Sequence, residues 1–303
     1  MNSQKLANSR FLQSKRSCLL AFIVLVLILA IIIPPAVVVP LRKKSMGPKS
    51  KVFVPLYVYP APGAWAPLEN VRGAEHCRVA THPSVNFTVV VNPGNGPGPD
   101  ALPDANYTRE IPRLASYNNV RLLGYVPVNY TNRDIGLVRR DIETYAKWPV
   151  NGSSPDLAVQ GIFFDETPQE YDDRAFGYLQ ELRDLVKGSS GLGPDNYVFQ
   201  NPGVVSDTRY LSTADSTVVF EATYDTFQER RKAKVFKTLS EDDREQLCAV
   251  IHSVPDSIQG SKLRSLVKKA RKVAEEVYVT HLRVDYYAGF GHSWGDFVDL
   301  MAA

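Results

Sequence analysis

GIFFDE, residues 161–166, runs a short apolar segment straight into two adjacent carboxylates, Asp165 and Glu166. Continuous apolar runs of about 4–8 residues are typical of strands that are buried on both faces of a parallel sheet. The 303-residue chain repeats this pattern along its length. We predict eight strands, at Val52–Tyr59, Phe87–Asn92, Val120–Val128, Val159–Asp165, Tyr197–Asn201, Thr217–Glu221, Leu247–Ser253 and Val277–Asp285.

Helical patterns separate several of these strands. In Ile135–Lys147, Arg174–Lys187 and Leu263–Val277, apolar residues recur at spacings of three and four, as on one face of a helix. Strands alternating with helices over about 250 residues predict an α/β fold, a (β/α)8 TIM-like barrel. An open doubly wound sheet is the alternative, but Pro60-Ala-Pro-Gly63 after the first strand contains no nucleotide-binding glycine motif. The segment after Gly289–Trp294 is short, so we do not expect a full eighth helix.

The N-terminal 51 residues differ in composition from the rest of the chain. They contain nine Lys or Arg and no acid, so the remainder is net acidic, which argues against a nucleic-acid partner. Residues 18–41 carry no charge and are long enough to cross a bilayer as one helix. We predict a cytoplasmic tail (1–17), a transmembrane signal-anchor (18–41), a linker (42–51) and a barrel domain (52–303). A cleaved signal peptide is the alternative, although its apolar region is usually only about 7–15 residues long.

Four N-glycosylation sequons follow the apolar run, at Asn86, Asn106, Asn129 and Asn151. Their number indicates a glycosylated domain on the exported side of the membrane. We therefore predict a single-pass type II protein of the cell membrane with an extracellular catalytic domain, or a cell-wall or secreted form after cleavage. Cys77 and Cys248 lie in that domain and form either one disulfide or two separate buried thiols.

Carboxylates end two of the predicted strands, with Asp165 and Glu166 on one and Glu221 on the other. A carboxylate at the end of a buried strand must be hydrogen-bonded, ion-paired or in a wet pocket, because an isolated buried charge is too costly. The structural alternatives are a helix N-cap for Asp165 or Glu166 and an ion pair for Glu221. Strand ends build the active sites of β/α barrels, and glycoside hydrolysis usually uses two carboxylates. We therefore predict these three residues as the catalytic groups of a glycoside hydrolase.

Polar and aromatic residues lie at the other strand ends. Aromatic faces stack on sugar rings, while hydroxyl and N–H groups orient the sugar hydroxyls; core packing is the alternative, with equal weight for Trp65 and Trp294. The five histidines show no H-E-x-x-H motif or close pair of metal ligands, and no G-x-S-x-G elbow is present, so we predict no metal site and no cofactor. Predicted substrate-binding residues are Tyr57, Trp65, Asn92, Tyr125, Asn201, His252, Tyr286 and Trp294.

Four motifs carry a resemblance to a known family. They are Val54-Pro-Leu-Tyr-Val-Tyr-Pro60, Val89-Val-Val-Asn-Pro-Gly-Asn-Gly-Pro-Gly98, Gly161-Ile-Phe-Phe-Asp-Glu166 and Phe220-Glu-Ala222. In combination, over about residues 52–297, the chain resembles the spherulin-4-like proteins, classified as glycoside hydrolase family 135. It looks most like a fungal member that cleaves galactosaminogalactan, a cell-wall and biofilm polymer of galactose and N-acetylgalactosamine.

The resemblance implies a (β/α)8 fold and an endo-acting α-1,4-N-acetylgalactosaminidase that makes or trims this polymer at the cell surface. By motif, Asp165 is the nucleophile or transition-state stabiliser, Glu221 the general acid/base and Glu166 a supporting carboxylate. The expected partners are the polysaccharide and, through the N-terminal helix, the membrane; we expect a monomer. The alternatives are a non-catalytic, lectin-like polysaccharide-binding protein and a glycosidase that acts on another amino-sugar polymer.

Overall fold

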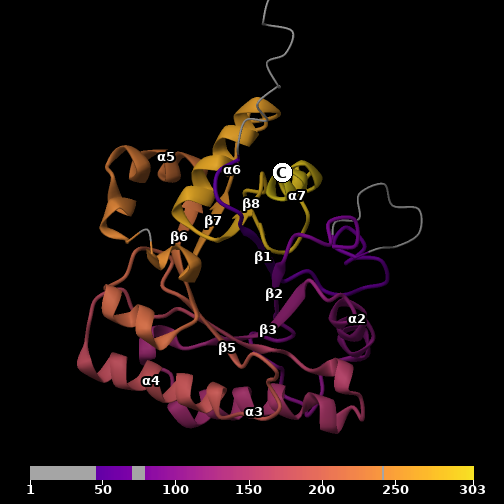
Figure 1. The fold of residues 1–303 in the computed structure, drawn as a ribbon. Coiled ribbons are helices and arrows are strands. Elements are labelled where there is room, and N and C mark those ends of the chain that lie inside the picture. The colour runs from indigo at the N-terminus through magenta and orange to yellow at the C-terminus, as the bar shows by residue number, and fades with distance from the viewer. Residues whose placement is uncertain (1–45, 70–78, 241) are drawn as a thin grey trace, which may run out of the picture. The chain divides into compact units, whose positions relative to one another are not determined.

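A closed parallel barrel forms the described part of the chain. The computed structural model describes residues 46–69, 79–240 and 242–303, and Met46–Ala303 is one compact unit. The strands follow one another in sequence order around the barrel, and β1 pairs with β8 through Val52 and Val277 (Figure 1). They are β1 (Lys51–Leu56), β2 (Phe87–Val91), β3 (Val120–Pro127), β4 (Gly161–Asp165), β5 (Tyr197–Asn201), β6 (Ser216–Thr223), β7 (Leu247–His252) and β8 (Glu276–Val279). This closure confirms the predicted barrel and excludes the open doubly wound sheet.

Helices lie around the outside of the barrel in Figure 1. They are α2 (Ala105–Ala115), α3 (Ile135–Asn151), α4 (Asp173–Lys187), α5 (Tyr224–Lys232), α6 (Ser261–Val273) and α7 (Trp294–Ala302). Between β5 and β6, the short 3-10 helix η4 (Thr208–Thr213) takes the place of an α-helix. The helix in the eighth position, α7, has only nine residues, in agreement with the short C-terminal segment.

Side chains that accept backbone N–H bonds define the helix starts. Asp104, Asp134, Asp172 and Thr223 cap α2, α3, α4 and α5, respectively. Such caps satisfy N–H groups that have no partner within the helix. Because Asp172 caps α4, the helix that follows β4, the capping role considered for Asp165 and Glu166 is wrong.

The predicted ends of two strands and two helices are wrong, and the helix predicted to end at Lys147 continues to Asn151. The strand predicted to continue to Asp285 ends at Val279, and the strand predicted to continue to Tyr59 ends at Leu56. An apolar run does not show where sheet pairing stops. The helix predicted to reach Val277 ends at Val273, because Ala274 is extended and Val277 pairs with strand residues on both sides.

Three phenylalanine rings fill the barrel interior. The Phe53 ring centroid lies 5.7 Å from that of Phe163 in β4 and 5.0 Å from that of Phe199 in β5. Because β1 is not a sheet neighbour of β4 or β5, these rings meet across the inside of the barrel. Side chains alternate between the two faces of a strand. Asp165 and Asn201, two residues beyond Phe163 and Phe199, therefore face inward one layer nearer the carboxyl end.

The amino end of the barrel contains a buried acid. Glu276 is fully buried, and its Oε1 accepts a 3.2 Å hydrogen bond from the Tyr197 hydroxyl. Burial raises the pKa of Glu276, and Lys51 acts in the opposite direction. Cys248 pairs in register with Glu276 and is a free, buried thiol, while Cys77, its partner in the disulfide alternative, lies outside the described residues.

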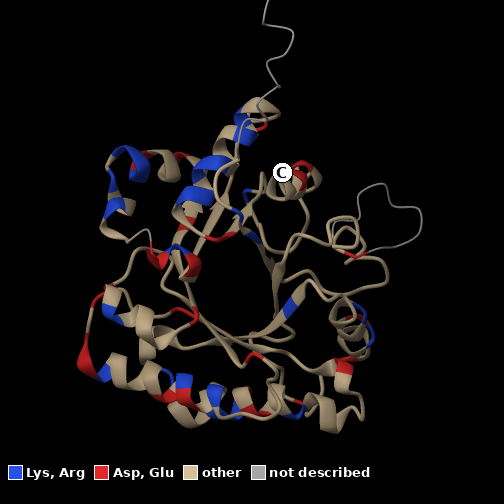
Figure 2. Cartoon of the chain, in the orientation of Figure 1, with Lys and Arg blue, Asp and Glu red and all other residues tan. Residues whose placement is uncertain are grey.

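Basic residues gather on α5 and α6, as Figure 2 shows. On α6, Leu263, Leu266 and Val267 are buried while Lys262 and Lys272 are exposed, so the basic stripe is the solvated face of an amphipathic helix. None of the described helices is long and apolar enough to span a membrane. The predicted signal-anchor, residues 18–41, lies outside the described residues and remains a prediction.

Candidate active site

Two carboxylates share one amide donor at the carboxyl end of the barrel. Asn201 Nδ2 lies 2.8 Å from Asp165 Oδ1 and 2.7 Å from Glu221 Oε2. The three residues come from β4, β5 and β6, which are successive strands. Because these oxygens lie 2.8 and 2.7 Å from one nitrogen, they are at most about 5.5 Å apart. The structure therefore brings together three of the predicted site residues and does so through Asn201.

Asp165 receives two further hydrogen bonds. The Tyr125 hydroxyl donates to Oδ2 at 2.8 Å, and the backbone N–H of Glu166 donates to Oδ1 at 2.9 Å. Burial raises the pKa of Asp165, while these hydrogen bonds and the one from Asn201 act to lower it. Three donors directed at one carboxylate stabilise its charged form in a site where burial disfavours charge.

Glu221 is held by the loop that follows β8. The Tyr287 hydroxyl donates a 2.6 Å hydrogen bond to Glu221 Oε1. Burial raises the pKa of Glu221 and the nearby Asp165 raises it further, against the hydrogen bonds from Tyr287 and Asn201. No ion pair to Glu221 is present among the described residues, so the predicted structural alternative, a pair with a buried Arg or Lys, is wrong.

Glu166 has a different environment from Asp165. Its side chain is exposed, and its backbone has a φ of 57°, in the left-handed region that costs a non-glycine residue about 1–3 kcal/mol. Its N–H donates to Asp165, and its carbonyl accepts a 2.6 Å hydrogen bond from the backbone N–H of Tyr130. The strained backbone of Glu166 thus positions Asp165, while the Glu166 carboxylate extends to the surface.

Tyrosine rings line the inner wall next to the carboxylates. Tyr57 makes edge-to-face contacts with Tyr125 and Tyr287, at centroid distances of 5.5 and 5.4 Å. The backbone N–H of Tyr57 also donates to the Tyr287 carbonyl at 3.1 Å. Burial, and next the charge of Asp165, raises the pKa of Tyr57 well above its usual value, so the hydroxyl stays protonated as a donor. Tyr57 and Tyr125 therefore lie beside the carboxylates, at the strand ends where substrate-binding residues were predicted.

His252 and Tyr286 form a stacked aromatic pair. Their rings are parallel within 1° at a centroid distance of 4.0 Å, and His252 Nδ1 lies 2.9 Å from Ser253 Oγ. Burial lowers the pKa of His252, so the ring is neutral at neutral pH. Tyr286 is half-buried. Burial raises its pKa most, and the charges of Glu221 and Asp165 raise it further, because Tyr286 lies near the two carboxylates.

Three predicted substrate-binding residues have structural contacts instead. Trp65 is 1% exposed and donates from Nε1 to the Val58 carbonyl, while Trp294 is 5% exposed and donates to the Pro67 carbonyl. Both indoles pack in the core, so their predicted exposure to substrate is wrong and the packing alternative holds. Asn92 accepts a 2.9 Å hydrogen bond from the Gly96 N–H and orders the loop after β2.

The predicted glycosylation sites lie in exposed or half-exposed positions. Asn86, Asn129 and Asn151 are exposed. Asn106 is half-buried, and its side-chain amide donates to the Tyr59 hydroxyl at 2.6 Å. The Asn151 side-chain amide also donates, to the Ala101 carbonyl at 3.1 Å, and glycosylation at the four sequons remains a prediction.

Tyr287 is one of the aromatic residues near the predicted strand ends but is absent from the predicted substrate-binding residues, although it contacts Glu221 directly. Tyr286 and Tyr287 are adjacent in an irregular loop, where no periodicity indicates which ring faces inward. A further cluster, Asp256, His281 and His292, also went unrecognised because its members are far apart in the sequence.

The fold and the site define a (β/α) barrel protein with a hydrogen-bonded carboxylate pair at its carboxyl end. The family model described as "Spherulation-specific family 4" matches residues 51–301, and the chain belongs to this family. The predicted resemblance to spherulin-4-like proteins is thereby confirmed.

Two relatives support this assignment. Spherulin-4 of Physarum polycephalum is 33% identical over 174 residues, which are 56% of this chain and 44% of spherulin-4, so the matched region spans less than half of that relative. The crystal structure of Aspergillus clavatus Sph3 in complex with GalNAc is 67% identical, with a TM-score of 0.81, and the match covers 85% of this chain and 99% of that chain.

Proposed function

We propose that the protein is an endo-acting glycoside hydrolase that cleaves α-1,4-linked N-acetylgalactosamine in galactosaminogalactan and so processes a cell-wall and biofilm exopolysaccharide. The observation that carries this proposal is the pair Asp165 and Glu221, bridged by Asn201 at the barrel mouth. Glycoside hydrolysis usually needs two such carboxylates on either side of the scissile bond. The GalNAc complex of Sph3, a relative with 67% identity, supports an amino sugar as the substrate.

The hydrogen bonds favour different roles for the two carboxylates. Asp165 accepts three hydrogen bonds, which suit a group that reacts as an anion, so we assign it as the nucleophile or electrostatic stabiliser. Burial raises the pKa of both carboxylates, and the neighbouring Asp165 raises that of Glu221 further, which suits Glu221 as a general acid that starts protonated. Glu166 supports Asp165 through its backbone N–H.

The separation of the carboxylates favours retention of anomeric configuration. The two oxygens bridged by Asn201 are at most about 5.5 Å apart, which fits the separation of about 5–5.5 Å that is typical of retaining enzymes and is shorter than the range of about 6.5–9.5 Å of inverting enzymes. In such a mechanism Asp165 attacks the anomeric carbon while Glu221 protonates the leaving oxygen. Glu221 then removes a proton from water, which hydrolyses the glycosyl-enzyme intermediate.

The aromatic residues supply a surface for sugar rings. The His252–Tyr286 stack and the Tyr57 ring lie beside the carboxylates, and aromatic faces pack on the apolar faces of sugars. The hydroxyl groups of Tyr57 and Tyr286 remain protonated and can donate hydrogen bonds to sugar oxygens. This arrangement supports a neutral amino-sugar polymer as the substrate.

A polymer digestion tests the proposal and separates its alternatives. Met46–Ala303 is incubated with acetylated galactosaminogalactan, with the deacetylated polymer and with chitin, and new reducing ends are counted. We expect oligosaccharide release from the acetylated polymer. Binding without release would favour the lectin-like alternative, while release from another polymer alone would favour a glycosidase of different specificity.

We also propose that a single N-terminal helix anchors the barrel as a type II membrane protein, with N-glycans on the extracellular side, and that the barrel is monomeric. The uncharged run of residues 18–41 and the exposed positions of Asn86, Asn129 and Asn151 support this location. Full-length protein should need detergent for extraction and should lose mass when treated with an enzyme that removes N-glycans. Extraction by high salt alone would contradict the anchor.

A further inference from the structure

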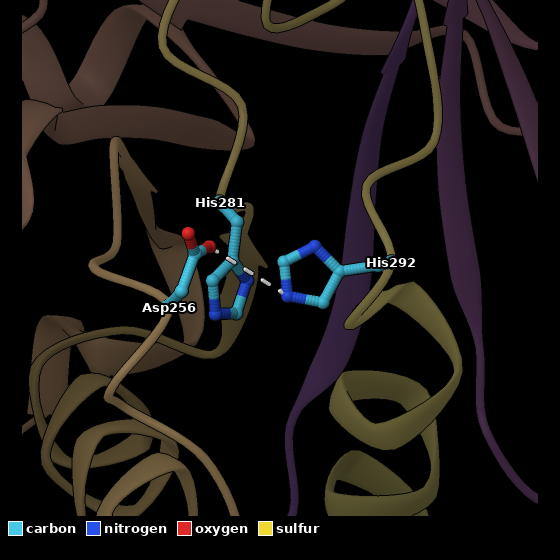
Figure 3. Close-up of side chains that lie close together, drawn as sticks. All are labelled: Asp256, His281 and His292. Atoms are coloured by element: carbon cyan, nitrogen blue, oxygen red, sulfur yellow. Dashed lines mark ion pairs between the residues drawn. The ribbon is translucent and has the colours of Figure 1, made fainter.

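A histidine–carboxylate cluster lies in the loops after the last two strands. Asp256 follows β7, His281 follows β8, and His292 precedes α7. Figure 3 shows the three side chains converging from two separate loop segments. One ligand atom from each residue lies within 4.8 Å of those of the other two, and His292 Nε2 is 3.8 Å from Asp256 Oδ1.

His281 is the buried member of this cluster. Its side chain is 6% exposed, and its ring centroid lies 4.4 Å from that of His292. His281 Nδ1 contacts Ser293 Oγ, while Nε2 is buried and makes no well-formed hydrogen bond among the described residues, although the Ile258 backbone also interacts with the ring. A buried ring nitrogen without a partner is costly, and it needs either a proton acceptor or a cation.

The donor set indicates the kind of cation. Two imidazoles and one carboxylate are typical ligands of zinc, whereas calcium and magnesium prefer oxygen ligands. Zinc–ligand bonds of about 2.0–2.2 Å require ligand atoms about 3.3 Å apart in a tetrahedral site. Asp256 and His292 are both exposed, so modest side-chain movements can close the present spacing.

The two histidines stand at the two ends of one loop. Residues 282–291 connect them, and this loop carries Tyr286, which stacks on His252, and Tyr287, which donates to Glu221. We propose that Asp256, His281 and His292 bind one zinc ion, which clamps the ends of this loop to the loop after β7. The zinc serves to hold Tyr286 and Tyr287 in position and takes no part in the chemical step. This proposal stands on the cluster alone and is independent of the proposed glycosidase activity.

Zinc titration of the full-length protein, prepared without a histidine tag and dialysed against a chelator, tests the site. We expect one Zn2+ per chain with micromolar or tighter affinity by calorimetry, and no binding of Ca2+. His292→Ala and Asp256→Asn, both at exposed positions where folding is not at risk, should each weaken zinc binding by at least about tenfold.

His82→Ala is the matched control. His82 lies near the surface, and its Nε2 is 2.8 Å from Asp299 Oδ1. It is a histidine beside a carboxylate, but it does not belong to the Asp256–His281–His292 cluster. This variant should bind zinc as the wild type does. Stoichiometry well below one, or equal affinity in His292→Ala and His82→Ala, would overturn the site.

Hydrogen exchange tests the clamp separately. Zinc should slow the exchange of backbone amides in residues 282–291 of the wild type and leave His292→Ala unchanged. Zinc binding that depends on His292 but does not alter exchange in this loop would overturn the positioning role.

Discussion

The Tyr287 hydroxyl lies 2.6 Å from Glu221 Oε1, and this hydrogen bond connects the loop after β8 to the carboxylate at the carboxyl end of β6. This hydrogen bond favours the charged form of Glu221. It therefore lowers the pKa of Glu221, whereas burial raises it. An enzyme that uses Glu221 as a general acid needs that pKa to stay within reach of the working pH.

Tyr287→Phe should therefore change the pH dependence of catalysis. Loss of the donor raises the pKa of Glu221, so the protonated acid persists to higher pH and the alkaline limb of kcat/KM shifts upward. We expect kcat to fall about 10–100-fold, since a hydrogen bond to a charged group is lost.

Tyr178→Phe is the control for this change. It removes a hydroxyl that donates to the Arg133 carbonyl from α4, away from the carboxylates, and should leave the pH profile of polymer cleavage unchanged. An unshifted alkaline limb in Tyr287→Phe would argue against Glu221 as the acid.

Asn201→Ala should impair both carboxylates at once. Asn201 Nδ2 is the donor shared by Asp165 and Glu221, and without it the two acids face each other with no group between them to offset their repulsion. We expect kcat/KM to fall about 100-fold. Asn118→Ala, an exposed change before β3 at the opposite end of the barrel, should retain activity. Activity of Asn201→Ala within a factor of two of the wild type would show that the bridge is dispensable.

Glu221→Gln should stabilise the fold at neutral pH. Burial raises the folded-state pKa of Glu221, so the neutral form is favoured in the folded protein, and stability is lost as the pH rises from about 4.3 through that raised pKa. The variant keeps a side chain of similar shape without the charge. Its Tm at pH 7 should exceed that of the wild type, at about 2–4 °C for each kcal/mol gained.

The Tm gain of Glu221→Gln should shrink as the pH falls towards 4, because Glu221 is then protonated in both folded and unfolded wild-type protein. Melting curves of both proteins at pH 4, 5.5 and 7 measure this. A gain that grows with acidity would contradict the raised pKa.

Proton NMR during digestion of a defined α-1,4-linked oligosaccharide gives the stereochemical outcome. The two carboxylate oxygens bridged by Asn201 are at most about 5.5 Å apart, which predicts that the first product is the α-anomer, with the β-anomer appearing only by later mutarotation. Initial release of the β-anomer would require a water between the two acids and would reassign Asp165 as a general base.

Much of the site could be predicted from the sequence because strand ends converge in a parallel barrel. Asp165, Asn201 and Glu221 each end an apolar run, and closure of the barrel brings such ends together. The side-chain alternation that places Asp165 above Phe163 also follows from the strand itself.

The remaining features depend on loops and on tertiary packing. Tyr287 and the Asp256–His281–His292 cluster lie in irregular segments, where no period indicates the direction of a side chain. Trp65 lies among glycines and prolines and Trp294 among glycine, histidine and serine, which are typical of exposed loops, yet both indoles are buried. Their burial comes from contacts between loop segments that are distant in the sequence, as when Trp294 Nε1 donates to the Pro67 carbonyl.

The most direct test of the central proposal is the kcat/KM of Asp165→Asn and Glu221→Gln on galactosaminogalactan, measured together with polymer binding. Each variant should lose at least about 1,000-fold in kcat/KM while still binding the polymer, because the lost group acts on the transition state. Glu181→Gln, a surface carboxylate change on α4, should match the wild type. If Asp165→Asn and Glu221→Gln cleave the polymer at the wild-type rate, the two carboxylates bridged by Asn201 are not the catalytic pair.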